Sequence, residues 1–185
     1  IKQRLGLKEH DYLLDLACGN GALSSLLSKY CKKLHGVDLS EFLITVAKEN
    51  FASSKLTFTC NDVVDYLSKV KNPDLFNKVL CYGSFSYLSE DAACEFLRLI
   101  YQRFSNVSRV FLGNLPDLNL KDLFFTKSVP SNSDLICNTT SIGIWRTESE
   151  FIGIAKNAGW VVDVSRMQGK FYASNYRYDV LLRRV

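Results

Sequence analysis

Short apolar runs alternate along the chain with stretches whose apolar residues are spaced three or four positions apart. The runs have the length of buried strands, and the stretches between them have the spacing of amphipathic helices. This alternation predicts an open α/β sheet whose strands are mostly parallel. The predicted strands cover residues 12–14, 33–38, 56–60, 76–81, 109–113, 160–164 and 178–182. The predicted helices cover residues 22–30, 40–49, 63–67, 89–100 and 148–158.

The last two predicted strands follow one another without a helix between them, so we expect them to be antiparallel. The helix before them is predicted from a capping box of Thr147 and Glu150 and ends at Gly159. At 185 residues and 47% hydrophobic, the chain has enough material for one core. We therefore predict a single domain over residues 1–185, a seven-stranded mixed sheet, mostly parallel with an antiparallel last strand, and helices on both faces.

Two other features of the chain bear on its organisation. It begins with Ile1 rather than Met, so we expect that a preceding extension or lid is missing. The segment 114–144 is polar, contains Pro116 and Pro130, and is long for a connection inside a compact domain. We predict that it forms the substrate region.

Charge and cysteine content exclude several kinds of function. The net charge of +4 is mild and its Lys and Arg residues are scattered, which weakly favours an anionic small molecule and argues against nucleic acid. No apolar run approaches the ~20 residues that span a bilayer, so we expect a cytoplasmic protein without a membrane partner. The six cysteines include no C-x-x-C pair and no nearby His, so no metal site is predicted. We interpret these cysteines as small buried hydrophobes.

Candidate ligand-binding residues follow four of the predicted strands, at the edge where ligands bind in open α/β sheets, and Cys81 and Tyr82 after the fourth would form the floor beside the reacting group. The first strand runs into Asp15 and a turn with Gly19 and Gly21, whose missing side chains let the backbone approach a ligand. The second strand ends in Asp38, which could accept hydrogen bonds from ribose hydroxyls. The third ends at Asp62, which could accept from an exocyclic amine or cap the next helix. Together they predict a nucleoside-cofactor site.

A nicotinamide dinucleotide is one alternative occupant of such a site. Its fingerprint is G-x-G-x-x-G, but Ser24 stands at the position of the third glycine. Asp15 before the turn would repel a pyrophosphate, whereas it suits a cationic ligand or could hold nearby backbone amides. A nicotinamide-dependent oxidoreductase therefore remains the weaker hypothesis.

Residues 15–21, with the pattern D-x-x-x-G-x-G, resemble the first motif of the class I S-adenosylmethionine-dependent methyltransferases. Residues 34–40 and 61–63 resemble the second and third motifs, and the likeness extends over essentially the whole chain. It implies a Rossmann-like fold and S-adenosylmethionine as the cofactor. The residues expected to bind this cofactor are Asp15, Ala17, Cys18, Gly19, Asn20, Gly21, Asp38, Leu39, Asn61, Asp62, Val63 and Tyr82.

The reaction that this resemblance implies is an in-line displacement, and an oxygen acceptor would also need a base. No base is assigned: Asp117 is the best-placed candidate, and Tyr82 and Asn114 are weaker ones. His10 and His35 lie away from the expected mouth of the site. Further residues that could face the acceptor are Ser84, Tyr87, Tyr172, Asn175, Tyr176 and Arg177, of which Tyr176 and Arg177 could equally serve hairpin packing.

The acceptor is less well determined than the cofactor. The N/D-P-P-Y motif, which is similar to that of enzymes that methylate exocyclic amines of bases, is missing after the fourth strand, where Cys81 and Tyr82 stand. Carboxylates that hold a metal in catechol methyltransferases are missing after the fourth and fifth strands, the latter ending in Gly113 and Asn114. We therefore expect methyl transfer to a small molecule, and the mild charge and the polar segment motivate a sugar or a nucleotide-linked metabolite. A non-catalytic S-adenosylmethionine-binding module remains the second alternative.

Overall fold

A computed structural model describes residues 1–128, 130–167, 169 and 171–184. Within these residues a single sheet has seven strands in the order β3-β2-β1-β4-β5-β7-β6. The strands are β1 (Tyr12–Leu16), β2 (Lys33–Asp38), β3 (Leu56–Cys60), β4 (Lys78–Tyr82), β5 (Arg109–Pro116), β6 (Val161–Arg166) and β7 (Arg177–Arg183). Neighbours from β3 to β5 pair in parallel, and β7 is antiparallel to both β5 and β6. The predicted mixed sheet with its antiparallel last strand is confirmed.

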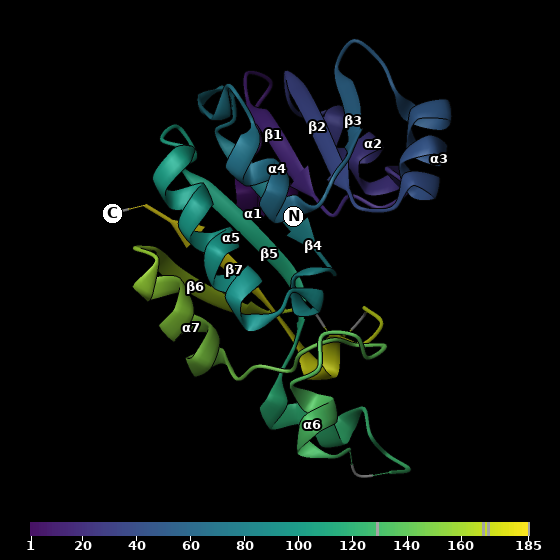
Figure 1. Cartoon of the computed structure of the whole chain (residues 1–185), viewed down its shortest axis with the longest axis vertical. Helices are drawn as coiled ribbons and strands as arrows, with labels where there is room; N and C mark the ends of the chain where they lie inside the picture. The colour runs from purple at the N-terminus through teal and green to yellow at the C-terminus, as the bar shows by residue number, and fades with distance from the viewer. Residues whose placement is uncertain (129, 168, 170, 185) are drawn as a thin grey trace.

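Helices cover both faces of this sheet, with α4, α5 and α7 on the face nearer the viewer in Figure 1. The opposite face packs against α1, α2 and α3. The helices are α1 (Lys2–Leu5), α2 (Ala22–Ser28), α3 (Glu41–Phe51), α4 (Val63–Lys69), α5 (Glu90–Arg103), α6 (Asn132–Leu135) and α7 (Glu148–Asn157). The 3-10 turns within the described residues are η1 (Pro73–Leu75), η2 (Phe85–Tyr87), η3 (Leu118–Leu123) and η4 (Ser174–Tyr176). Among the described helices, none has the length and apolar character needed to cross a membrane.

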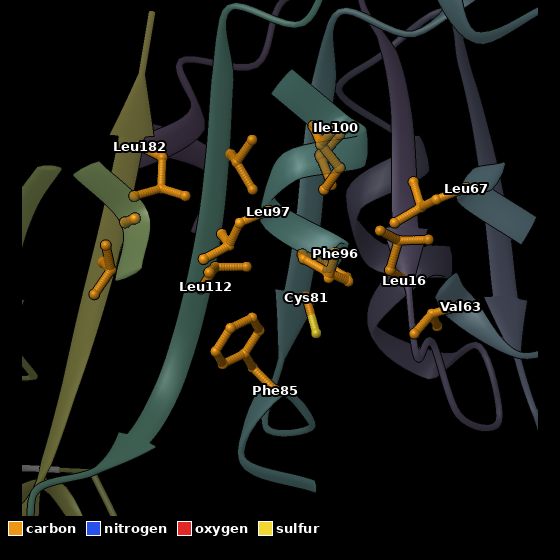
Figure 2. Packing of buried hydrophobic residues seen from close by; sticks show 14 of the residues in the cluster. Leu16, Val63, Leu67, Cys81, Phe85, Phe96, Leu97, Ile100, Leu112 and Leu182 are labelled. Atoms are coloured by element: carbon orange, nitrogen blue, oxygen red, sulfur yellow. The ribbon is translucent and has the colours of Figure 1, made fainter. Parts of the chain in front are cut away.

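The larger core lies between the sheet and α4, α5 and α7. Phe96, Leu97 and Ile100 of α5 are fully buried there because they recur at helical spacing along one face. Figure 2 shows them packed against Leu112 of β5 and Leu16 of β1. This core keeps the carboxyl ends of β1, β4 and β5 at one edge of the sheet.

A smaller core holds the segment that the sequence predicts as the substrate region. Buried Leu135, Trp145 and Tyr176 form its centre, and Phe124 and Phe125 pack on it. In Figure 1 α6 and its neighbours lie beyond the carboxyl end of β5. The segment is therefore largely a folded cap rather than an open polar loop, because its aromatic residues bury one another.

Some predicted details are wrong. The fourth strand begins at Lys78 rather than at residue 76, since Phe76 turns into the core after η1. The cysteines are also not uniformly buried. Cys18, Cys31 and Cys81 are, Cys137 is partly exposed, and Cys60 and Cys94 are exposed. Among the described residues no group of three or more His, Cys, Asp or Glu could hold a metal ion.

Candidate cofactor and acceptor site

The turn after β1 is built from residues in the left-handed backbone region. Ala17, Gly19 and Gly21 have φ of 58°, 56° and 77°. The Gly21 N–H donates to the Cys18 carbonyl at 3.1 Å, and the Gly21 carbonyl then accepts from Ser25 at 2.8 Å to begin α2. The turn thus reverses the chain within four residues and leaves its backbone at the carboxyl edge of the sheet, where the strand order reverses between β1 and β4.

The two glycines of this turn have different surroundings. A Cβ on Gly21 would lie 2.8 Å from the Phe58 ring and 2.9 Å from the Ala47 Cβ, so this glycine is required by packing. A Cβ on Gly19 would meet no atom within 4 Å. The space beside Gly19 is therefore open for a ligand to approach the backbone.

Asp38, at the end of β2, holds the turn in place. One of its carboxylate oxygens accepts from the Gly19 N–H at 2.8 Å, and the other accepts from the Ser40 N–H at 2.9 Å. A carboxylate offers about four acceptor positions, so each oxygen keeps one for a hydroxyl of a ligand. Asp38 can therefore orient the turn and bind a ribose at the same time.

The end of β3 brings a second acid to the same edge. Asp62 is exposed, and its Oδ1 caps α4 by accepting from Val64 at 2.8 Å and Asp65 at 2.9 Å. Asp62 can therefore cap α4 and bind a ligand at the same time, because capping uses Oδ1 and leaves Oδ2 to accept from an amine. Leu39, directly after Asp38, is 70% exposed and offers an apolar surface beside these acids.

The remaining predicted cofactor residues support the turn or flank it. The Cys18 N–H donates to the Val37 carbonyl at 3.0 Å and joins the turn to β2. The Asn20 side chain accepts from Ala22 at 3.2 Å at the start of α2. Asn61 donates its backbone N–H to the Asp38 carbonyl at 3.0 Å, and Val63 is buried in the larger core.

Asp15 lies beneath the turn rather than on its surface. It is 2% exposed, and its carboxyl group accepts a 2.5 Å hydrogen bond from the Ser24 hydroxyl. Burial raises the pKa of Asp15 to about 7, opposed by the Ser24 hydrogen bond and assisted by the negative charge of Asp38. The sequence contains a sign of this pair, because Ser24 stands where a dinucleotide fold would have glycine. The pair ties β1 to α2.

A cavity of about 250 Å³ opens beside the ends of β4 and β5. Tyr82 forms part of its wall, and its hydroxyl lies 3.7 Å from the Met167 sulfur. Burial raises the pKa of Tyr82, and the charge of Asp179 adds to the shift, so the phenol stays protonated at neutral pH. The other lining residues are Asn114, Phe171, Tyr172, Ala173 and Arg177.

A bulge in β5 directs Asn114 into this cavity. The register between β5 and β7 shifts between Leu112 and Leu115, and Asn114 has φ of 67°. Its backbone N–H donates to the Asp179 carboxylate at 2.8 Å, and its carbonyl accepts from Arg177 at 2.7 Å. Sequence reasoning missed Asp179, although an acid within the apolar strand 178–182 was a sign of it. These two side chains hold the strained residue in place.

Asp117 does not join this cavity. It is 1% exposed, its carboxylate caps η3 by accepting from Asn119 at 3.0 Å, and it forms an ion pair with Arg166. Arg166 also pairs with Glu148 of α7, so this cluster lies on the α7 side of the sheet. The structure therefore gives no support to Asp117 as the base.

The other residues predicted to face the acceptor are dispersed. The Tyr87 hydroxyl donates to the Ser141 carbonyl at 2.7 Å and ties η2 to the cap. Tyr176 stacks on Trp145 with ring centroids 5.6 Å apart, so it serves packing. Ser84 is partly exposed and Asn175 is exposed, and neither lines the cavity. Tyr172 and Arg177 are the two that do.

Neither histidine reaches this edge. The Nδ1 of His35 lies 2.8 Å from the Thr57 hydroxyl, and its ring stacks on Tyr66 at 5.5 Å between centroids. Burial lowers the pKa of His35. His10 precedes β1 and lies beside Asp11, at the opposite end of the strand from the turn.

The sequence model of the family described as "Methyltransferase domain" matches residues 13–105, which is half of the chain. The chain belongs to this methyltransferase family. The matched residues include the turn after β1 and all the predicted cofactor residues. S-adenosylmethionine is the cofactor of the class I fold that this domain adopts, and the open space beside Gly19 and the unused acceptor positions of Asp38 fit it.

Curated methyltransferases match parts of this chain by sequence. A ubiquinone biosynthesis O-methyltransferase from Coxiella burnetii is 40% identical over 65 residues, 34% of this chain and 27% of that protein. The methyltransferase chain thus matches only about a quarter of the length of this curated relative.

Solved structures agree on the fold. A TehB-like SAM-dependent methyltransferase from Corynebacterium glutamicum has a TM-score of 0.66 and 18% identity, covering 96% of this chain and 82% of its own. A magnesium protoporphyrin IX methyltransferase from Synechocystis with bound SAH has a TM-score of 0.69 and 18% identity, and the match covers 95% of this chain and 75% of that one. At this identity the likeness concerns the fold of the methyltransferase and not its acceptor.

Proposed function

We propose that this domain transfers a methyl group from S-adenosylmethionine to a small-molecule acceptor held in the cavity beside Tyr82. One observation carries the proposal: the cavity lies at the ends of β4 and β5, at the same edge of the sheet as the cofactor turn after β1. Donor and acceptor would then lie side by side, which is what an in-line displacement needs. When bound, the cofactor supplies an electrophilic methyl group on a positively charged sulfur.

The residues around the turn would bind this cofactor through three kinds of contact. The backbone at Gly19 allows close approach, Asp38 accepts from the ribose hydroxyls, and the free oxygen of Asp62 accepts from the adenine amine. The partly exposed carboxylate of Asp38 and the exposed one of Asp62 also favour a cationic ligand by simple attraction.

Tyr82 and Asn114 would face the acceptor. Because its pKa is raised, the Tyr82 phenol is a hydrogen-bond donor that can orient an acceptor oxygen, rather than a base. Asn114 is fixed by its two backbone hydrogen bonds and offers an amide that can donate or accept. In this proposal much of the rate comes from positioning the acceptor beside the cofactor. A sugar or nucleotide-linked acceptor and a cytoplasmic location stay predictions.

Calorimetric titration of the full-length protein with S-adenosylhomocysteine tests the cofactor half of the proposal. The Asp38→Ala variant should bind at least tenfold more weakly, since a hydrogen bond to a charged group is worth about 1.5–3 kcal/mol. Asp122→Ala is the matched control, because its side chain is 83% exposed and lies in η3. Absence of heat with the wild-type protein would contradict the proposal.

Turnover tests the catalytic half. Methyl-labelled cofactor incubated with the full-length protein and a cell extract should yield a labelled small molecule. A non-catalytic binding module would bind S-adenosylhomocysteine normally but leave every extract component unlabelled. Competition by NAD for the same site would instead favour the oxidoreductase hypothesis.

A further inference from the structure

The guanidinium of Arg177 is only partly used by the protein. Its Nη1 donates to the Asn114 carbonyl at 2.7 Å, and the group lies over the Tyr176 ring, 5.1 Å from the centroid. Its Nε is buried and has no hydrogen-bond partner. No contact within the described part of the chain uses Nη2 either. One edge of the guanidinium is therefore left without acceptors.

This free edge has a defined chemical preference. The Nε–H and one Nη–H of an arginine point in the same direction and match the two oxygens of a carboxylate. Nε is enclosed by the protein whereas Nη2 is not, so a ligand in the cavity reaches this edge through Nη2, whose N–H groups form charge-assisted hydrogen bonds with a carboxylate oxygen. Arg177 lines the cavity beside Tyr82, so the acceptor itself can supply that oxygen.

The walls and the charge of the cavity narrow the choice further. Tyr82, Phe171 and Tyr172 contribute aromatic surface, and the last two are 60% and 94% exposed. Arg177 is the single cationic side chain among the described lining residues. The charge of Asp179 is close enough to act on Tyr82. One guanidinium near a carboxylate suits an anion of single charge better than a doubly charged phosphate.

We propose that the acceptor is an aromatic carboxylic acid whose carboxylate binds Nη2 of Arg177, rather than the sugar or nucleotide-linked metabolite that the sequence suggests. Its ring would lie among Tyr82, Phe171 and Tyr172, with the group that is methylated on the side of β4. This inference rests on the proposed function, because it names the substrate class of the same cavity.

The test compares an acid with its neutral amide on the full-length protein. Calorimetry with 3-hydroxybenzoate and 3-hydroxybenzamide should show at least tenfold tighter binding of the acid to the wild-type protein loaded with S-adenosylhomocysteine. Arg177→Gln should abolish this preference without changing the affinity for S-adenosylhomocysteine. Arg183→Gln, an exposed arginine on the same strand, is the matched control and should keep the preference.

The purely structural role of Arg177 predicts a different pattern. If Arg177 only supports Asn114, the Gln variant should lose affinity for the acid and for the amide to the same extent, and that result would overturn the inference. Arg177→Lys keeps the charge and can still reach the Asn114 carbonyl, so it serves if the Gln variant does not fold. The Lys variant should retain at most a small part of the preference for the acid over the amide. Equal affinities of the wild-type protein for acid and amide would also overturn the inference.

Failure of the proposed function gives a separate result. In that case S-adenosylhomocysteine does not bind. The acid and amide titrations, run without it, still decide whether Arg177 recognises a carboxylate.

Discussion

Replacing Asp15 by Asn should remove a large part of the pH dependence of folding stability. Asp15 is 2% exposed, and burial raises its pKa from 3.8 to about 7. Between these two values the folded protein holds a proton that the unfolded chain has released. The stabilising contribution is therefore complete below pH 3.8 and is lost as the pH rises through about 7.

The magnitude follows from the size of the shift. A shift of about three pKa units corresponds to about 4 kcal/mol, or about 1.4 kcal/mol for each pH unit inside the window. Asn cannot ionise, yet its amide oxygen can still accept the hydrogen bond from Ser24. Relative to Asp15→Asn, the wild-type protein should therefore lose about 2 kcal/mol of unfolding free energy between pH 5 and pH 7, because the slope falls as the folded carboxyl begins to ionise near pH 7.

Urea denaturation followed by circular dichroism at pH 5, 6, 7 and 8 measures this difference. Asp122→Asn is the control, because that side chain is 83% exposed and should follow the wild-type curve. Parallel pH profiles for the wild-type protein and Asp15→Asn would refute the reasoning. They would mean that the carboxyl ionises in the folded state as easily as in water.

Two further substitutions separate folding from binding. Gly21→Ala should destabilise the fold by about 2–4 kcal/mol in urea denaturation, since strain at φ of 77° adds to a clash with Phe58. Gly19→Ala should lower the free energy of unfolding by only about 1–2 kcal/mol but weaken the binding of S-adenosylhomocysteine at least tenfold in calorimetry. An unchanged affinity would argue against a close approach of the ligand to Gly19. Asp117→Asn should destabilise the fold by about 1.5–3 kcal/mol through the lost charged hydrogen bond to Arg166 and leave the affinity for S-adenosylhomocysteine unchanged, whereas a lost affinity would return Asp117 to the site.

Most of the architecture could be predicted from the sequence because it depends on local patterns. The strands 33–38 and 56–60 have their predicted bounds, and the helix after Thr147 begins at the predicted capping box. Gly159, with φ of 98°, follows the end of that helix as predicted. Periodicity, capping and turn chemistry are all encoded within a few residues, so one chain suffices to recognise them.

The parts that could not be predicted depend on partners distant in sequence. The role of Asp117 is decided by Arg166, which follows it by 49 residues, and no local pattern pairs them. The bulge at Asn114 depends on Asp179 and Arg177 of β7. The fold of the segment 114–144 was not predicted, because its polar residues outnumber the aromatic ones that fold it over Trp145. Candidate cofactor residues were easier to predict than candidate acceptor residues for the same reason.

The strand order has a consequence for how this protein could change over evolution. The residues predicted to hold the cofactor lie within 15–82, on β1 to β4, whereas those of the acceptor cavity other than Tyr82 lie within 114–177. The two sets occupy separate stretches of the gene and meet at one edge of the sheet. Recombination or randomisation of the second stretch could therefore create new acceptor preferences while donor affinity is inherited intact from the first.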